Sequence, residues 1–253
     1  MTTARNVRVY NGVLKEGEYH HASWENQRRF LRFLLRTLAF TLLVRLDKVE
    51  GLENIPDRGP GLLLMNHIGW VDPMVVIHTM PRQIVPLGKV EAFDYPVIGI
   101  FPRIWGSIPV RREGVDRRAV QSALEVLRKK EIILVAPEGT RNPELQRAKE
   151  GFAYLATRSG APIIPVIIEG SPGYPTIRYS KLWKKNGIAI RYGAPIAFHS
   201  EYRHADREQL RKLTDEAMYH LAAMLPEERR GYYSDLTKSS QDTYDVIDIS
   251  SYS

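Results

Sequence analysis

The chain has 253 residues, of which 43% are hydrophobic and 26% are charged. This composition is typical of one large folded domain and excludes a disordered chain. The formal net charge of +7 favours an anionic partner such as nucleic acid, a phosphorylated substrate or an acidic membrane surface. Because there is no cysteine, disulfides, cysteine-ligated metal sites and a thiol nucleophile are excluded, and a cytoplasmic location is favoured.

The N-terminal region lacks the basic, apolar and small-residue order of a secretory signal, so no export is expected. Residues 28–46 read RRFLRFLLRTLAFTLLVRL, whose uncharged stretch is far shorter than the ~20 residues that cross a bilayer. The arginines fall on one arc of a helix and the leucines and phenylalanines largely on the other. This pattern predicts a basic amphipathic helix lying in a membrane interface, or alternatively a surface helix packed on the core. The arginines are Arg28, Arg29, Arg32 and Arg36.

Apolar runs of strand and helix length alternate along the rest of the chain. Strands are expected over residues 62–65, 84–87, 107–110, 132–136, 163–168 and 187–192. Helices are expected over residues 73–80, 115–130, 148–158 and 205–224. This alternation predicts a single α/β domain with a mixed, largely parallel sheet flanked by helices. The expected organisation is a helical segment at 1–50, the domain at 51–233, and a disordered tail rich in Ser, Asp and Tyr at 234–253.

The sequence NHIGWVD lies between a predicted strand and a predicted helix, which is where α/β sheets place their sites. A histidine such as His67 accepts a proton near neutral pH, and a carboxylate such as Asp72 can hold its other ring nitrogen. The two residues are therefore a candidate general base and its orienting partner. In the alternative interpretation, Asp72 before Pro73 caps a helix and His67 is a core histidine.

Further blocks follow other predicted strands. The sequence APEGTR offers Glu138, a glycine turn at Gly139 and a guanidinium at Arg141, and the sequence GSIPVR ends on Arg111. Arginine suits bidentate phosphate binding, so these strand ends are candidates for an anion site. The block APIIPV, residues 161–166, is an apolar strand without polar chemistry.

In this order and at these separations, the four blocks resemble those of the glycerolipid acyltransferase family, which includes the bacterial 1-acylglycerol-3-phosphate acyltransferases. NHIGWVD matches its N-H-x4-D block, GSIPVR its glycine-to-arginine block, APEGTR its P-E-G-T-R block and APIIPV its proline block. The segment from Gly88 to Glu91 matches a lysine-and-glutamate segment. The resemblance covers about residues 62–166. Departures at Pro109, Ala136 and Asn142 concern the shape of the acceptor pocket more than the chemistry.

The resemblance implies that His67 deprotonates an acceptor hydroxyl while Asp72 orients it, and that the oxygen attacks an acyl thioester directly. The sequence agrees with direct transfer, since it offers neither a cysteine nor a G-x-S-x-G serine. The donor would be acyl-CoA or acyl carrier protein, used as a substrate, with no cofactor and no metal. The resemblance assigns the acceptor site to Lys89, Arg111, Glu138, Gly139, Thr140 and Arg141.

The predicted function is acylation of 1-acylglycerol 3-phosphate (lysophosphatidate) to phosphatidate, by a peripheral or monotopic protein on the cytoplasmic face of the membrane. Its partners would be membrane lipids and the acyl donor. Nucleic acid is not expected, because no phosphate loop, zinc-finger spacing or aromatic RNA-binding signature is present. Alternatives are another acceptor, such as glycerol 3-phosphate or a lysophospholipid, and a non-catalytic lipid-binding protein. A metal hydrolase using His67, Asp72 and Glu138 lacks a third histidine at ligand spacing.

Overall fold

The computed structural model describes residues 21–96, 99–111, 113–185 and 187–249. At its centre lies a nine-stranded sheet in the order β1-β7-β6-β2-β5-β3-β4, with β8 paired to β6 and β9 paired to β8. The strands are β1 (Leu46–Glu50), β2 (Gly61–Met65), β3 (Ile84–Lys89), β4 (Ile108–Val110), β5 (Ile132–Val135), β6 (Ile163–Glu169), β7 (Ile188–Tyr192), β8 (Ile196–Phe198) and β9 (Tyr244–Val246).

Most neighbouring strands run parallel. The central strand β2 pairs in parallel with β5 and β6, and β3 pairs in parallel with β5 and β4. β1 is also parallel to β7, whereas β7 and β8 run antiparallel to β6, and β9 runs antiparallel to β8. The mixed, largely parallel sheet predicted from the sequence is therefore confirmed.

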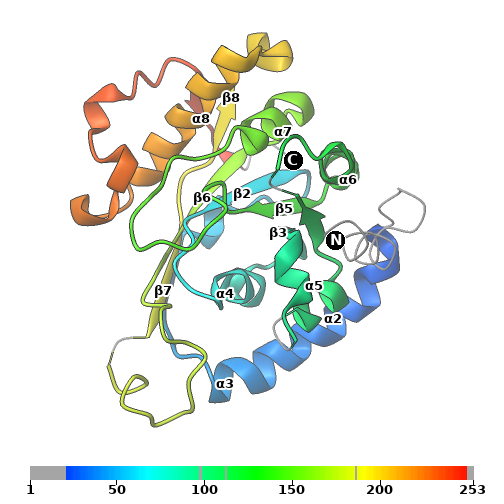
Figure 1. The fold of residues 1–253 in the computed structure, drawn as a ribbon, viewed down its shortest axis with the longest axis vertical. Helices are drawn as coiled ribbons and strands as arrows, with labels where there is room; N and C mark the ends of the chain where they lie inside the picture. The colour runs from blue at the N-terminus through cyan, green and yellow to red at the C-terminus, as the bar shows by residue number, and fades with distance from the viewer. Residues whose placement is uncertain (1–20, 97–98, 112, 186, 250–253) are drawn as a thin grey trace.

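Helices cover both faces of this sheet (Figure 1). They include α4 (Asp72–Thr79), α5 (Ile100–Trp105), α6 (Arg117–Arg128), α7 (Gly151–Ser159) and α8 (Arg207–Ala222). Strand β2 reads GLLLM and buries every residue, as expected of a parallel strand covered on both sides. Leu62 and Leu64 belong to the core shared with α6, α7 and α8. Leu63 and Met65 belong to the core shared with α4 and the N-terminal helix, because side chains alternate along a strand.

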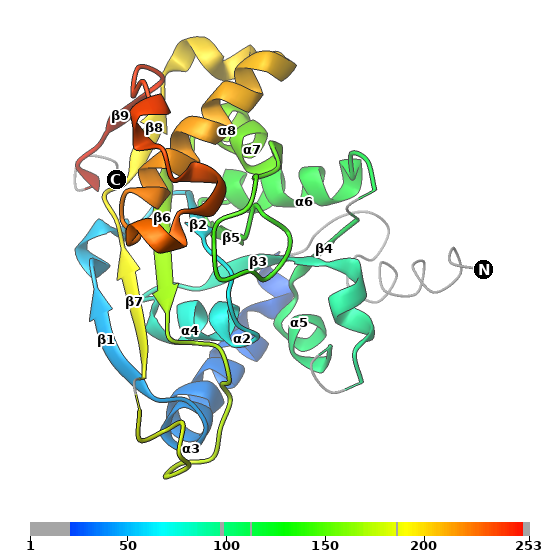
Figure 2. The same cartoon turned by 60° about the vertical axis from the view of Figure 1, so that its left-hand side comes forward.

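The predicted N-terminal helix is present, but its boundaries and the face that it turns toward the domain differ from the prediction. It consists of α2 (Glu25–Leu34), a π-helical turn η3 (Leu35–Ala39) and α3 (Phe40–Leu42). The predicted segment, residues 28–46, therefore starts too late and ends too late. Strand β1 follows the helix at once and places this part of the chain at one edge of the sheet (Figure 2).

The arginines of this helix face the domain. Arg28 is fully buried, and its guanidinium donates from Nε to the carbonyl oxygen of Trp105 (2.8 Å) and from Nη2 to that of Gly106 (3.0 Å). Arg32 and Arg36 donate to carbonyl oxygens in the last turn of α4 and just beyond it. The last carbonyls of a helix lack intrahelical partners and carry its partial negative charge. The arginines therefore stabilise the ends of α5 and α4.

The predicted basic strip is consequently wrong for three of its four arginines. Arg29 differs from the others, since its guanidinium forms an exposed ion pair with Glu25 (2.9 Å) instead of binding carbonyl oxygens of the domain. Large apolar side chains occupy the solvent side of the helix instead. Those with the largest exposed fractions are Phe30 (61%), Phe33 (61%), Leu38 (55%), Leu42 (49%) and Leu43 (40%). The amphipathic pattern is real, but its polar arc binds backbone carbonyls and its apolar arc faces outward.

Within the described residues, the C-terminal tail has regular structure, contrary to the predicted disorder. It forms a short turn, η9 (Leu236–Lys238), and strand β9. On α8, the buried Glu216 carboxylate accepts hydrogen bonds from Ser239 Oγ (2.9 Å) and from the backbone N–H groups of Ser240 (2.9 Å) and Gln241 (3.0 Å). The polar residues whose composition predicted disorder thus bind a buried carboxylate.

The predicted domain boundaries also change. Strand β1 precedes residue 51 and pairs with β7, so the sheet begins inside the segment assigned to the N-terminal helix. The tail strand β9 belongs to the same sheet. Residues 1–20 of the predicted N-terminal segment and residues 250–253 of the predicted tail lie outside the described residues.

Candidate active site

Four parallel strands end at one edge of the sheet, and each carries a predicted site residue at or just past its end. Lys89 is the last residue of β3, and Arg111 follows β4, where Lys89 and Val110 are register partners. His67 follows β2 and Glu138 follows β5, which are also in parallel register. The topology therefore brings the sequence blocks to one edge, where α/β sheets place ligand sites.

The imidazole of His67 is held by the carboxylate of Asp72. His67 Nδ1 lies 2.9 Å from Asp72 Oδ2, and the same oxygen accepts the backbone N–H groups of Ile68 and Gly69 at 2.7 Å each. With Asp72 ionised, Nδ1 is the donor of this contact, which leaves Nε2 as the proton acceptor of the ring. Asp72 is fully buried, whereas the His67 side chain is 20% exposed.

The hydrogen bonds of Asp72 bear on the interpretation of this residue as a helix cap. Asp72 opens α4, but its side chain makes no capping bond to that helix. Its hydrogen bonds go to the loop that carries His67 instead. The helix-cap interpretation is therefore wrong, and the arrangement matches that of a general base with an orienting carboxylate.

Ser171 binds the second carboxylate oxygen of Asp72 and was not predicted from the sequence. Its hydroxyl donates a short hydrogen bond to Asp72 Oδ1, and the residue is fully buried. A Cβ on Gly69 would collide with the Ser171 side chain, so glycine is required for the loop to approach it. Ser171 follows the end of β6, which lies beside β2. Its position after a parallel strand also predicts that Ser171 lies at this edge. In the sequence, however, an uncharged residue after an apolar strand gives no sign of a functional role.

Glu138 lies against the loop that carries His67. The backbone N–H of Asn142 donates to the carbonyl oxygen of His67 (2.9 Å), and that of Gln146 donates to Glu138 Oε2 (2.6 Å). Burial raises the pKa of Glu138 to about 7, against the opposing effect of the backbone N–H groups of Gln146 and His67. Gly139 has φ +69°, a left-handed conformation that favours glycine and turns the loop back after Glu138.

The raised pKa of Glu138 predicts a specific pH dependence of stability. The folded state binds this proton more tightly than the unfolded state, whose value is 4.5. The contribution is therefore fully present below pH 4.5 and is lost as the pH rises through about 7, with a full size of about 3 kcal/mol. Glu138→Gln should remove it, so the wild-type free energy of unfolding should fall relative to that of the variant between pH 4.5 and 8. Urea unfolding across this range measures the difference, and parallel pH profiles would contradict the assignment.

Two cations and two aromatic rings form a cluster beside the dyad. The Arg141 guanidinium carbon lies 3.3 Å from the centre of the Trp70 ring, and Trp70 meets Tyr95 edge to face at 5.4 Å. Lys89 Nζ lies 5.9 Å from the Tyr95 ring. Among the residues that the structure describes, neither cation forms an ion pair with a carboxylate. Both are thus suited to an external anion, and Trp70 and Tyr95 are functional candidates that sequence reasoning missed.

Desolvation lowers the pKa of Arg141, while Tyr95 and Asp72 oppose this shift. An arginine remains charged at neutral pH after such a shift. Arg141 is therefore a partly desolvated cation placed on a rigid aromatic face. Such a cation interacts more strongly with an anion than a fully solvated one does.

The remaining predicted residues lie at the same edge but are more open. Arg111 is exposed, and its backbone N–H donates to Asp116 Oδ2 (2.9 Å). Thr140 is exposed on the loop after Glu138. In the described part of the chain, no group of three or more His, Asp and Glu side chains is arranged to hold a metal ion.

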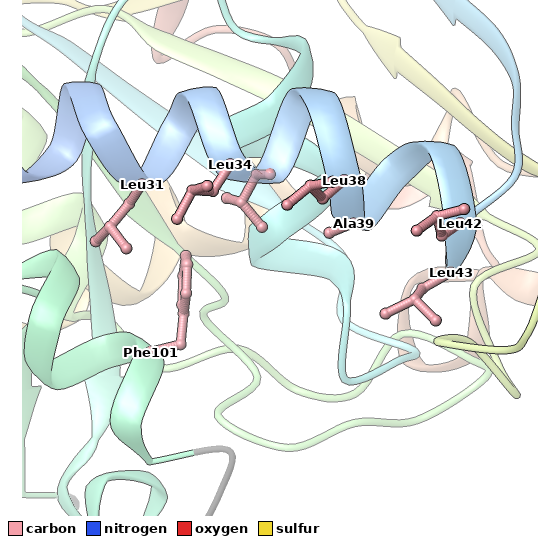
Figure 3. A pocket seen from close by; sticks show the side chains of 8 residues that line it. Leu31, Leu34, Leu38, Ala39, Leu42, Leu43 and Phe101 are labelled. Atoms are coloured by element: carbon pink, nitrogen blue, oxygen red, sulfur yellow. The ribbon is translucent and has the colours of Figure 1, made fainter.

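An apolar groove of about 340 Å³ runs along the N-terminal helix (Figure 3). Every side chain that lines it is apolar: Leu31, Leu34, Leu35, Leu38, Ala39, Leu42, Leu43 and Phe101. Phe101 of α5 lines the groove opposite the leucines of the helix. Within the described residues, no helix has the length and apolar character needed to span a membrane.

Comparisons with known proteins give matches to an acyltransferase family model and to named acyltransferases. Residues 47–169 match the family model described as Acyltransferase. The 1-acyl-sn-glycerol-3-phosphate acyltransferase of Bacillus subtilis is 29% identical over 171 residues, which cover 66% of this chain and 82% of that protein. The enzyme of the same name from Borreliella burgdorferi is 32% identical over 124 residues, covering 47% of this chain and 50% of that protein.

A solved structure supports the fold. The crystal structure of the 1-acyl-sn-glycerophosphate (LPA) acyltransferase PlsC from Thermotoga maritima superposes with a TM-score of 0.54 at 21% identity. The match covers 84% of this chain and 85% of that chain.

Proposed function

We propose that this chain, whose residues 47–169 match the acyltransferase family model, transfers a fatty acyl group from an acyl thioester to the free hydroxyl of 1-acylglycerol 3-phosphate. The product is phosphatidate. The observation that carries this proposal is the buried Asp72 carboxylate holding His67 beside the cation Arg141. A general base next to an anion site is what acylation of a phosphate-bearing alcohol requires.

The proposed reaction has one direct transfer step. His67 Nε2 takes the proton of the acceptor hydroxyl while the oxygen attacks the thioester carbonyl. The C–O bond forms, the C–S bond breaks, and the imidazolium returns the proton to the departing thiolate. Asp72, fixed by Ser171 and two backbone N–H groups, holds the ring and stabilises its positive charge. Acyl-CoA or acyl carrier protein enters as a substrate, and the reaction needs no cofactor.

The acceptor phosphate is proposed to bind the cation cluster. Arg141 offers a planar guanidinium for bidentate contact, and Lys89 adds charge across Tyr95. Arg111, at the neighbouring strand end, extends the positive edge. Glu138, Gly139 and Thr140 shape the loop that carries Arg141.

The function is tested by offering purified protein three acceptors with either donor. Lysophosphatidate, glycerol 3-phosphate and lysophosphatidylcholine are presented in vesicles or detergent with acyl-CoA or acyl carrier protein. We expect the fastest turnover with lysophosphatidate. Preference for one of the other acceptors would reassign the substrate. No transfer to any acceptor would favour the alternative of a non-catalytic lipid-binding protein.

Arg141→Ala should lower kcat/KM for lysophosphatidate by about 10- to 100-fold, the range expected for losing a hydrogen bond to a charged group. The KM for the acyl donor should change much less. Arg111→Ala should act in the same direction with a smaller effect, because Arg111 is more exposed. Arg128→Ala on α6 is the matched control, since this exposed arginine pairs with Glu125 away from the site. If Arg141→Ala raised only the donor KM, the arginine would instead bind the phosphates of the coenzyme.

We also propose that the enzyme acts as a peripheral or monotopic protein on the cytoplasmic face of the membrane. The apolar outer face of the N-terminal helix, with Phe30 and Phe33 each 61% exposed, supports this location. A helix that exposes several large apolar side chains on one face is typical of interfacial insertion. The two-tailed product also has to be released into a bilayer.

A further inference from the structure

The segment between β6 and β7, residues 171–185, is here called the β6–β7 loop. Its sequence, SPGYPTIRYSKLWKK, contains no acidic residue. Its cations are Arg178, Lys181, Lys184 and Lys185, all exposed. At its tip, Ile177 is 76% exposed and Tyr179 is 70% exposed. Tyr179 also has φ +71°, a left-handed conformation that bulky side chains rarely adopt.

The β6–β7 loop packs against the end of the N-terminal helix. The backbone N–H of Thr176 donates to the carbonyl oxygen of Leu43 (2.8 Å), and that of Arg178 donates to the carbonyl oxygen of Leu42 (2.9 Å). Figures 1 and 2 both place this loop beside α3. Its exposed tip residue Ile177 lies between these two hydrogen-bonded positions, so the loop continues the apolar outer face of the helix.

The loop is anchored, which keeps its tip in place. The buried Tyr174 packs edge to face on Trp183 at 6.4 Å. Arg45 Nη1 donates to the carbonyl oxygens of Trp183 (2.7 Å) and Lys185 (3.0 Å). The tip residues are therefore exposed even though the loop makes several contacts with the domain. They project from a loop whose two ends are fixed to the domain.

The distribution of charge identifies the partner. Three of the helix arginines donate to carbonyl oxygens of the domain, and Arg28 among them is fully buried, so their guanidinium groups are held against the domain. The four cations of the β6–β7 loop lie beside the same apolar surface, and the loop carries no acid to offset them. Apolar side chains flanked by uncompensated cations suit an anionic bilayer, whose interface accepts both.

We propose that the β6–β7 loop is a second membrane-contact element that binds anionic lipid bilayers. Ile177 and Tyr179 enter the interface, and the four cations face the lipid headgroups. The inference rests on the proposed function in one respect, namely that the substrate is held in a bilayer. The loop begins at Ser171, which is hydrogen-bonded to Asp72, so a docked loop holds the edge that carries the dyad close to the membrane.

The test compares three proteins on vesicles. The loop variant carries Arg178→Gln, Lys181→Gln, Lys184→Gln and Lys185→Gln. The control variant removes the same charge from the far side of the molecule, with Arg117→Gln, Arg128→Gln, Lys129→Gln and Lys130→Gln on and after α6 (Figure 1). Co-sedimentation is measured on vesicles of phosphatidylcholine alone and of phosphatidylcholine with phosphatidylglycerol, and thermal unfolding shows that each variant folds.

Each basic residue near an anionic surface strengthens partitioning by about fivefold, so the loop variant should partition at least tenfold more weakly onto anionic vesicles. The control variant should change much less, and neither should change on neutral vesicles. Wild-type binding by the loop variant, or an equal loss in both variants, would overturn the proposal. If the fourfold variant did not fold, the pair Lys184→Gln and Lys185→Gln, with Arg128→Gln and Lys129→Gln as its control, would give the same comparison at a smaller amplitude.

Activity separates this proposal from the proposed function. With a short-chain, water-soluble lysophosphatidate, turnover by the loop variant should equal that of wild type, because the loop charges do not touch the acceptor site. Unchanged vesicle binding with a raised KM for acyl carrier protein would assign the surface to that acidic carrier and overturn the membrane assignment. Loss of anionic vesicle binding in a protein that transfers no acyl group would uphold the loop and reject the proposed function.

Discussion

His67→Ala should reduce acyl transfer by about 10²- to 10⁴-fold, the usual contribution of general-base assistance. The substitution should leave the fold intact, because the side chain is partly exposed and the buried carboxylate beside it keeps three other hydrogen bonds. Turnover of lysophosphatidate and thermal unfolding measure the two expectations. A variant that melts like wild type and retains more than about a tenth of its activity would refute the catalytic assignment.

Asp72→Asn is the companion variant, and its expected result differs in kind. An amide cannot accept at both terminal atoms, so one of the four donors that surround Asp72 loses its partner. We expect a smaller loss of activity than for His67→Ala, together with a lowered melting temperature. Ser171→Ala removes one donor and leaves the carboxylate, so it should reduce kcat moderately with little change in KM.

The sequence predicted the sheet and the gathering of the site because both depend on short-range patterns. Apolar runs such as GLLLM at residues 61–65 can be satisfied only by a strand buried on both faces. Once such strands run parallel, the residues that follow them must meet at one edge. This rule predicts that His67, Glu138 and Arg111 gather at one edge, while their expected roles came from the resemblance of the sequence blocks to the acyltransferase family.

Features that depend on long-range partners could not be predicted in the same way. A helical pattern in RRFLRFLLR shows which side chains share a face, but not which face meets the domain. The outcome was set by the C-terminal carbonyls of α4 and α5, which lie over 40 residues away in the chain. The structure of the tail could not be predicted for the same reason. Its residues Ser239, Ser240 and Gln241 bind Glu216 on a helix that lies more than 20 residues away in the chain.

Three short strands were not predicted, for a related reason. Strand β1, with the sequence LDKVE, carries two charged residues and one apolar residue between its ends. It becomes a strand because β7 offers it a parallel edge. Strands β8 and β9 have three residues each, too few for a periodic pattern to be visible.

Arg28→Met should lower the free energy of unfolding by about 2–4 kcal/mol, because hydrogen bonds from a charged donor are lost and buried carbonyls remain without it. Arg28 has no exposed surface, and it binds Trp105 and Gly106 where α5 ends. Arg29→Met is the matched control on the same helix, since its exposed ion pair with Glu25 should contribute less than about 1 kcal/mol.

The comparison also tests the orientation of the helix. Urea unfolding of the two variants at one pH and salt concentration gives the difference directly, and added salt should affect the Arg29 variant more than the Arg28 variant. Equal stabilities would mean that Arg28 does not serve as an internal anchor. The arginines would then be available to bind anionic lipid, as the sequence predicted. In that case, binding to anionic vesicles would fall when Arg28 and Arg32 are changed to glutamine. A large gap between the two variants instead fixes the arginines as internal anchors and leaves the apolar side chains as the outer face of the helix.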